Sequence, residues 1–132
     1  MDLLEKKIEK LEQTTDGVAA CNTILYLVKR INEQNRDQVM AALMRYGDNG
    51  LVEFHRGFAV GKVVELMDKP DSGYSDFFMS CIQSRDSSKA YWGIGGYVKA
   101  VGKAACNALL PFVFLHDFPV ACKANIIMQL SK

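Results

Sequence analysis

The last third of the chain, residues 88–132, limits the possible fold most strongly. Three segments with helical periodicity follow one another there, separated by a glycine turn and by a corner that contains proline. Gly93, Gly95 and Gly96 stand inside one of these helices. Each glycine in a helix costs about 0.5–1 kcal/mol relative to alanine, so three of them indicate close packing against another helix. The segment therefore predicts stacked helical hairpins.

The same periodicity continues through the rest of the chain. Long helical segments begin near residues 16, 50, 87 and 118, a spacing of about 31–37 residues that is typical of helical-hairpin arrays. Each long segment is followed by a shorter one, which we expect to be its partner. The expected helices cover residues 2–14, 18–31, 36–46, 51–67, 74–84, 89–101, 103–115 and 119–130, with turns at 47–50 and 69–73.

These segments predict an all-α protein of about seven to eight helices. With 132 residues, the chain has the length of one domain, so we expect a single helical-repeat domain over 1–132. Its predicted architecture is a right-handed α-solenoid of the HEAT or armadillo type, with about three and a half hairpins. The short helices should form one face of it. The core should centre on Leu25, Phe54, Phe58, Phe78, Ile94, Leu109 and Ile126.

Composition and charge favour a cytoplasmic protein without nucleic acid or membrane partners. The net charge of +1 lacks the basic excess of a nucleic-acid binder. No apolar stretch is long enough to cross a bilayer, and the first residues lack the apolar core of a signal peptide. Cys21, Cys81, Cys106 and Cys122 are widely spaced and form no CxxC pair, so we expect reduced core cysteines.

No group of residues has a pattern typical of catalysis. The glycine run at 93–96 lacks the preceding strand of a dinucleotide site, and the chain contains no phosphate-loop GK[ST] motif. His55 and His116 have no second histidine or carboxylate at a metal-ligand spacing on a helix. A serine elbow is absent, and no base can be assigned to activate a cysteine. We therefore expect no enzyme, no metal and no cofactor.

A partner-binding face is predicted from the repeat architecture. In a hairpin stack, the second helices of successive repeats line the usual binding surface. Adjacent aromatic residues on a helix point about 100° apart, so Trp92 should fill a gap between hairpins while Tyr91 stays near the surface. For each polar residue of this face, the alternative is an ordinary solvated side chain. The predicted partner-binding residues are Asp37, Arg45, Asp48, Tyr74, Asp76, Gln83, Tyr91 and Asn107, with Asp48 at a turn.

Residues 90–132, AYWGIGGYVKAVGKAACNALLPFVFLHDFPVACKANIIMQLSK, resemble the closing repeats of a known group of proteins. A Tyr-Trp pair opens the first helix, and Lys99 and Gly102 stand near its end. An Asp-Phe-Pro corner at 117–119 then leads into a helix containing Lys123 and Leu130. These features are similar to those of HEAT-like immunity proteins from bacterial polymorphic-toxin and contact-dependent growth inhibition systems.

The resemblance implies an immunity protein that binds a cognate toxin, with a cytosolic nuclease domain as the expected target, and occludes its active site. Such a protein needs a preorganised surface that rejects other toxins, and no chemistry of its own. The alternative is a helical-repeat scaffold or regulatory subunit that binds another host protein or peptide. The sequence leaves the oligomeric state open, a homo-oligomer included.

Overall fold

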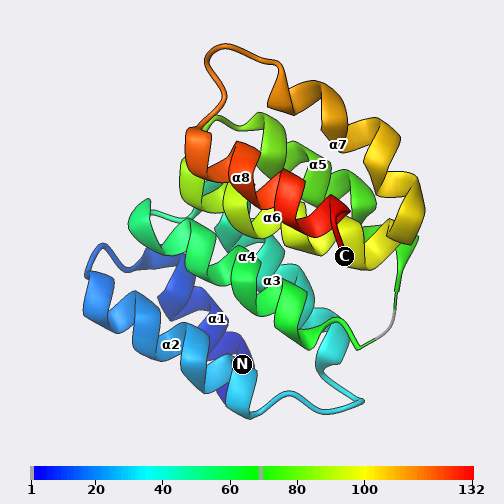
Figure 1. The fold of residues 1–132 in the computed structure, drawn as a ribbon. Coiled ribbons are helices and arrows are strands. Elements are labelled where there is room, and N and C mark those ends of the chain that lie inside the picture. The colour runs from blue at the N-terminus through cyan, green and yellow to red at the C-terminus, as the bar shows by residue number, and fades with distance from the viewer. Residues whose placement is uncertain (1, 69) are drawn as a thin grey trace. The chain divides into compact units, whose positions relative to one another are not determined.

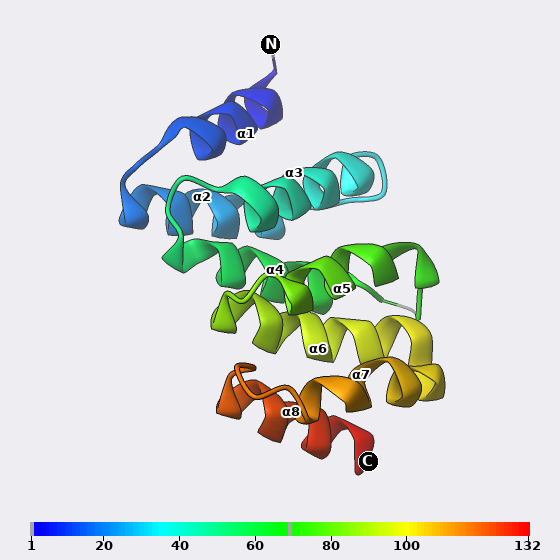
Figure 2. The same ribbon diagram turned by 90° about the horizontal axis from the view of Figure 1, so that it is seen from above.

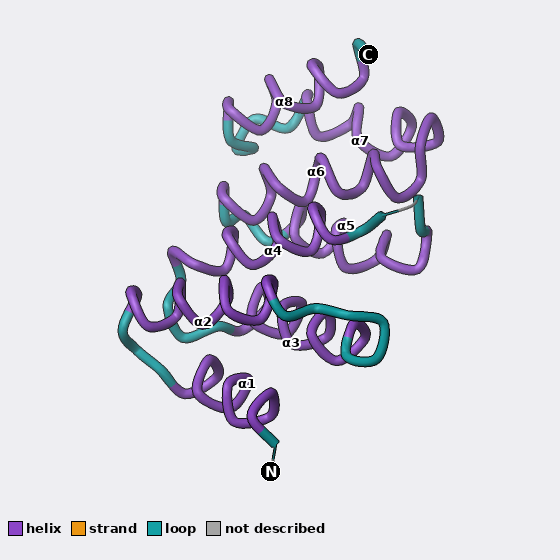
Figure 3. Tube along the Cα trace, turned by 90° about the horizontal axis from the view of Figure 1, so that it is seen from below, coloured by secondary structure: helices purple, strands orange, loops and turns teal. Residues whose placement is uncertain are grey.

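The computed structural model describes residues 2–68 and 70–132, and every regular element in these ranges is helical (Figure 1, Figure 3). This confirms the all-α prediction, and each helix begins and ends within three residues of its predicted bounds. None of the described helices is long and apolar enough to cross a membrane. The elements are α1 (Leu3–Gln13), α2 (Gly17–Lys29), α3 (Arg36–Asn49), α4 (Phe54–Leu66), the 3-10 turn η1 (Ser72–Tyr74), α5 (Ser75–Gln83), α6 (Ser87–Val101), the 3-10 turn η2 (Gly102–Ala104), α7 (Ala105–Val113) and α8 (Val120–Leu130).

The chain divides into two compact units, Met1–Leu66 and Met67–Lys132. In the first unit, α1 packs against α2, α3 packs against α4, and the two hairpins meet where α2 contacts α4. In the second unit, hairpins α5/α6 and α7/α8 meet where α6 contacts α8 (Figure 2). Each unit therefore contains two stacked hairpins. A continuous solenoid over the whole chain, its handedness and the single domain stay predictions.

The pairing of short and long helices differs from the predicted one. Each short helix packs most extensively against the long helix that follows it, as α3 does with α4 and α5 with α6. The order of long and short segments in the sequence predicts instead that each short helix pairs with the long helix before it. In the second unit, the difference arises because the side of α6 that carries its glycines packs against α5 and not against α7.

Two of the three glycines in α6 are needed for this contact. A Cβ atom at Gly93 would lie 2.9 Å from the Cβ of Cys81 and 3.0 Å from the carbonyl oxygen of Phe78. A Cβ atom at Gly96 would lie 2.5 Å from the Phe78 ring. At Gly95, by contrast, the nearest atom would be 3.9 Å away. The prediction that these glycines permit close helix packing is therefore confirmed for Gly93 and Gly96, with α5 as the neighbour.

The core of the second unit contains most of the correctly predicted core residues. Phe78, Ile94, Leu109 and Ile126 are all fully buried, as expected. Ile94, Leu109 and Ile126 belong to one cluster in which α6, α7 and α8 meet. The complete cluster is Ile82, Ala90, Ile94, Ala105, Leu109, Phe118, Cys122 and Ile126.

Two core predictions in the first unit are wrong. Leu25 is 37% exposed, because it lies about 100° around α2 from the buried Ile24. Phe54 is 91% exposed, because α4 starts at this residue and not at Leu51. The third predicted core residue of this unit, Phe58, is partly buried. Periodicity therefore located these helices but not the side of each that faces a neighbour.

The predicted turn at residues 47–50 is also wrong, because α3 continues to Asn49 and ends at Gly50. A Cβ atom at Gly50 would lie 2.5 Å from the ring of Tyr46. The Tyr46 hydroxyl accepts a hydrogen bond from the Val52 amide at 3.3 Å, and burial raises the pKa of this hydroxyl. The chain therefore leaves the helix at Gly50, because any side chain at this position would collide with the Tyr46 ring. At the end of α6, Gly102 has φ +67° and is the helix C-cap.

The cysteines do not all lie in the core. Within the described residues, none of the four forms a disulfide. Cys81 and Cys122 are buried, and burial raises the pKa of the Cys122 thiol. Cys21 is partly buried, whereas Cys106 is exposed on the first turn of α7, so its assignment to the core is wrong.

Alanine substitutions in α6 separate the packing role of its glycines from helix propensity. Gly93→Ala should lower the free energy of unfolding by about 1–3 kcal/mol, because the new Cβ meets the fixed backbone of α5. Gly95→Ala should raise it by about 0.5–1 kcal/mol, because that position has room. Urea denaturation measures both changes. Equal effects of the two substitutions would contradict the proposed contact.

Candidate partner-binding site

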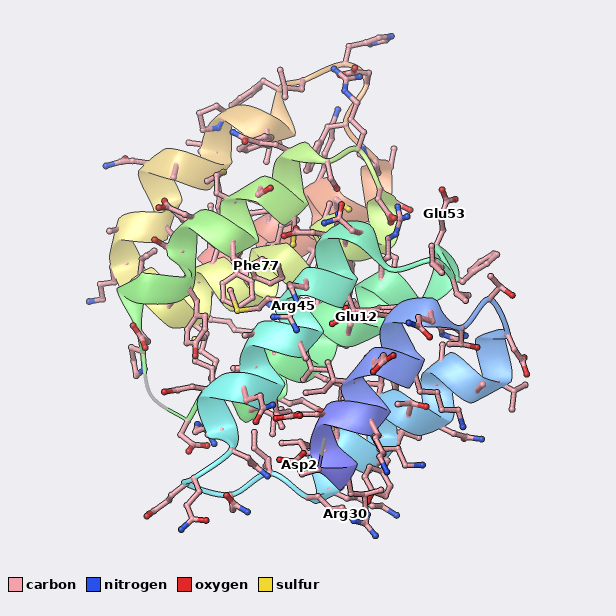
Figure 4. All side chains as sticks on the ribbon, turned by 180° about the vertical axis from the view of Figure 1, so that it is seen from behind. Asp2, Glu12, Arg30, Arg45, Glu53 and Phe77 are labelled. Carbon is pink, nitrogen blue, oxygen red and sulfur yellow. The ribbon has the colours of Figure 1, made fainter. Side chains whose placement is uncertain are left out.

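Three predicted site residues lie on α3 in the first unit. Asp37, Arg45 and Asp48 are all exposed, and their positions fall within about 80° of one another around the helix. Asp48 lies in the last turn of α3 rather than in the predicted turn after it. Arg45 donates a hydrogen bond to a carboxylate oxygen of Glu12 on α1 at 3.1 Å (Figure 4). One side of α3 thus presents two carboxylates beside an arginine that is already paired.

The other five predicted residues lie in the second unit. Asp76 and Gln83 are exposed on the same side of α5, seven residues apart. Tyr74 in η1 is partly buried, with its ring centroid 6.4 Å from that of Phe78. Asn107 is exposed on α7. Within the first unit, the structure thus groups three predicted residues on α3, and within the second unit it groups two on α5. A face shared by both units stays a prediction.

The aromatic pair on α6 differs in part from its prediction. Tyr91 is 40% exposed, in line with a surface position. Trp92 is 43% exposed, so the prediction that it fills a gap is wrong. The sides of α6 that face its neighbours already carry glycine and small or branched apolar residues, which leaves the indole outside. The two rings pack edge to face, with centroids 5.6 Å apart.

Large apolar side chains gather on the last hairpin. On α7, Leu110 and the residue that ends the helix, Phe114, lie four positions apart and are 44% and 79% exposed. On α8, Val120, Ile127 and Met128 follow helical spacing and are 80%, 54% and 49% exposed. Single exposed apolar residues are normal, whereas large contiguous apolar patches on monomers are uncommon. We call these five residues the terminal apolar face.

Asn107 connects the predicted site with this face. It lies three positions before Leu110 and seven before Phe114, so the three residues share one side of α7. The only charged residue of α8 is Lys123, which is partly buried. The outward side of α8 is therefore apolar, while α7 contributes an amide beside it.

A small cavity of about 210 Å³ lies at the corner between the ends of α5 and α7. Ring contacts help to form its wall, since the centroids of Phe112 and Phe118 are 5.2 Å apart. Its volume is below the roughly 300–1,000 Å³ of typical small-molecule sites. The lining residues are Ile82, Gln83, Arg85, Phe112, Leu115, Asp117, Phe118 and Pro119, which we call the corner pocket.

An ion pair joins the two loops at the rim of the corner pocket. Arg85 donates a hydrogen bond to a carboxylate oxygen of Asp117, and both side chains are largely exposed. Arg85 has φ +67°, a left-handed conformation seen at no other non-glycine position in the described part of the chain. Such a conformation costs about 1–3 kcal/mol and persists where the surroundings impose it. The hydrogen bond and charge of Arg85 hold the pKa of Asp117 below its ordinary value of 3.8.

Sequence reasoning found the polar residues of this region and missed the apolar ones. Gln83 lines the corner pocket and Asn107 borders the terminal apolar face. The near absence of charged residues in α8 could have indicated an exposed apolar side. However, a helix with few charged residues is equally typical of a fully buried helix. Only the packing of α8 against α6 and α7 shows which of its sides is left uncovered.

Comparison with family models, with curated proteins and with solved structures finds no match to this chain.

The rim ion pair predicts a change in titration. Arg85→Gln should return the pKa of Asp117 toward 3.8, because the substitution removes the neighbouring positive charge. A carboxylate with a lowered folded-state pKa stabilises the fold above its unfolded pKa, and this contribution is lost as pH falls through the folded value. Carboxyl NMR titration measures the shift directly. Lys103→Gln, which removes an exposed cation elsewhere in the unit, should leave the titration unchanged.

Proposed function

We propose that the protein is an immunity protein that binds a cognate toxin domain and neutralises it by occluding its active site. The observation that carries the binding part of this proposal is the terminal apolar face. Its five side chains would leave water when a partner covers them, which is favourable by about 25 cal/mol for each Å² of apolar surface. The choice of a toxin as the partner comes from the resemblance of residues 90–132 to HEAT-like immunity proteins.

The surroundings of this face fit the usual anatomy of a protein interface. Interfaces combine an apolar centre with a polar rim, and a few aromatic or arginine anchors carry most of the binding free energy. Phe114 is the one aromatic residue of the face and is 79% exposed, and Asn107 supplies an amide on the same side of α7. The corner pocket adds an apolar hollow with Arg85 and Gln83 at its rim. In this proposal, a toxin loop places one apolar side chain in the pocket.

The exposed carboxylates Asp48 and Asp76 would contribute electrostatic attraction to the toxin. A nuclease domain that binds nucleic acid carries a basic surface, and Asp48 and Asp76 would attract it. Such charges raise the association rate and the selectivity more than the affinity. The proposal places the protein in the cytoplasm, where a toxin that cleaves nucleic acid acts. A scaffold that binds a different host protein would use the same face, and a growth test distinguishes the two.

The growth test uses the gene next to this one in its genome. Expression of the toxic C-terminal domain encoded there should stop growth, and co-expression of this protein should restore it. Phe114→Asp together with Ile127→Asp should abolish the rescue and weaken toxin binding by about thirtyfold or more, since anchors of this kind contribute about 2 kcal/mol or more. Both side chains are exposed, so thermal unfolding should stay unchanged.

Phe54→Asp provides the matched control, because this phenylalanine is 91% exposed and lies in the other unit. It should leave the rescue intact. Full rescue by the double variant would reject the terminal apolar face as the interface. Binding without any rescue of growth would favour the scaffold.

Charge reversal tests the electrostatic part separately. Asp48→Lys with Asp76→Lys should slow toxin association and weaken its dependence on salt, because attraction between exposed charges is screened by ions. The dissociation rate should change little. Stopped-flow association measured at low and high salt gives both quantities. Wild-type association rates at both salt concentrations would exclude these carboxylates from the encounter.

A further inference from the structure

A second surface with different chemistry lies in the first unit, where one tyrosine ring gathers two cations. The Nζ atom of Lys7 on α1 lies 4.8 Å from the ring centroid of Tyr26 on α2. Arg30, the C-cap residue of α2, is labelled in Figure 4, and its guanidinium carbon lies 3.9 Å from the same centroid. The π electrons of the ring attract each of the two cations. One ring at the surface thus holds a cation from α1 and a cation from the end of α2.

Beside this ring, a hollow of about 400 Å³ runs between α1 and α2. Lys7 and Lys10 line it from α1, and Asn22 and Tyr26 line it from α2. Val18, which is 70% exposed, adds an apolar patch. Lys10 also borders a neighbouring hollow of about 430 Å³ that includes Lys6. We call the surface formed by Lys6, Lys7, Lys10, Val18, Tyr26 and Arg30 the basic groove.

Positive charge exceeds negative charge in the basic groove. Its four cations, Lys6, Lys7, Lys10 and Arg30, make no ion pair within the described ranges 2–68 and 70–132. Two carboxylates line the same hollows, and each accepts a hydrogen bond from a neutral amide. Asp16 accepts a hydrogen bond from the Val18 amide at 3.0 Å and caps α2, and Glu9 accepts one from the Gln13 amide at 3.4 Å. An incoming anion would therefore find donors that lack an anionic partner.

We propose that the basic groove binds an acidic segment of a partner protein. A carboxylate in the hollow would form charge-assisted hydrogen bonds with Lys7 and Lys10, which both line it, and Arg30 beside Tyr26 adds to the attraction. An apolar side chain of the same segment would cover Val18. Amphipathic segments combine these two features when they bind in a groove between helices.

Nucleic acid fits the same groove less well. A phosphate backbone carries a charge at every nucleotide, so it would also meet the carboxylates of Glu9 and Asp16. The net charge of +1 lacks the basic excess typical of nucleic-acid binders. A peptide can place acidic residues at the cations and neutral ones elsewhere. The groove shares no residue with the terminal apolar face or the corner pocket, so this inference does not depend on the toxin partner.

The test uses a fluorescein-labelled peptide with glutamate and leucine at helical spacing, and a counterpart with glutamine for glutamate. Fluorescence anisotropy should show binding of the glutamate peptide that weakens as salt rises, and none of the glutamine peptide. Lys7→Glu with Lys10→Glu should weaken binding by about tenfold or more, because attraction becomes repulsion. The matched control, Lys103→Glu with Lys132→Glu, changes the net charge equally at exposed positions of the second unit and should stay within about twofold of wild type.

Two further variants distinguish a loss of binding from a loss of folding. Lys7→Gln with Lys10→Gln removes the charges without adding repulsion, and it should still weaken binding while circular dichroism and thermal unfolding match wild type. Tyr26→Leu should also weaken binding, because the cations lose the ring that gathers them. Equal binding of the two peptides, or equal losses in the groove and control variants, would overturn the proposal. So would tighter binding of labelled single-stranded DNA than of the glutamate peptide.

Discussion

The contact between the Phe78 ring and the glycine side of α6 determines how the second unit is built. Gly96 lets the ring approach to a distance at which any Cβ would collide, and Gly93 does the same for the α5 backbone. The two helices consequently pack closely enough for a corner of three residues, 84–86, to join them. That short corner holds Arg85 in a left-handed conformation and brings it to Asp117. The corner pocket is thus a consequence of the way in which α5 lies on α6.

The exposed apolar surface follows from the position of the last hairpin. The inner sides of α7 and α8 cover α6 through Leu109, Cys122 and Ile126. No other described helix of this unit covers their outer sides, and Phe114 and Ile127 are exposed. In a hairpin array, each repeat normally buries such a side against its neighbour. The apolar outer side therefore has the chemistry of a repeat interface, which makes it suitable for a protein partner.

The helices could be predicted from sequence because their apolar periodicity is local, and the outward sides could not. Phe78 and Ile94 were assigned to the core correctly, since they stand at the centre of their apolar stripes. Leu25 and Trp92 belong to helices that are apolar on more than one side, so their exposure depends on which helices pair. Polar site residues such as Gln83 and Asn107 could be suggested from their helices alone. The terminal apolar face required knowledge of the order in which the hairpins pack.

Charge within the first unit is divided between its hairpins, and this has a consequence for selectivity. The groove between α1 and α2 presents cations, of which Lys7 and Arg30 share one ring. The exposed side of α3 presents Asp37 and Asp48. A partner that touches both surfaces would have to offer acidic and basic groups in the matching order, and a partner with one sign of charge would be attracted at one surface and repelled at the other. Because exposed charges add little affinity, their arrangement discriminates between partners more than it strengthens any single complex.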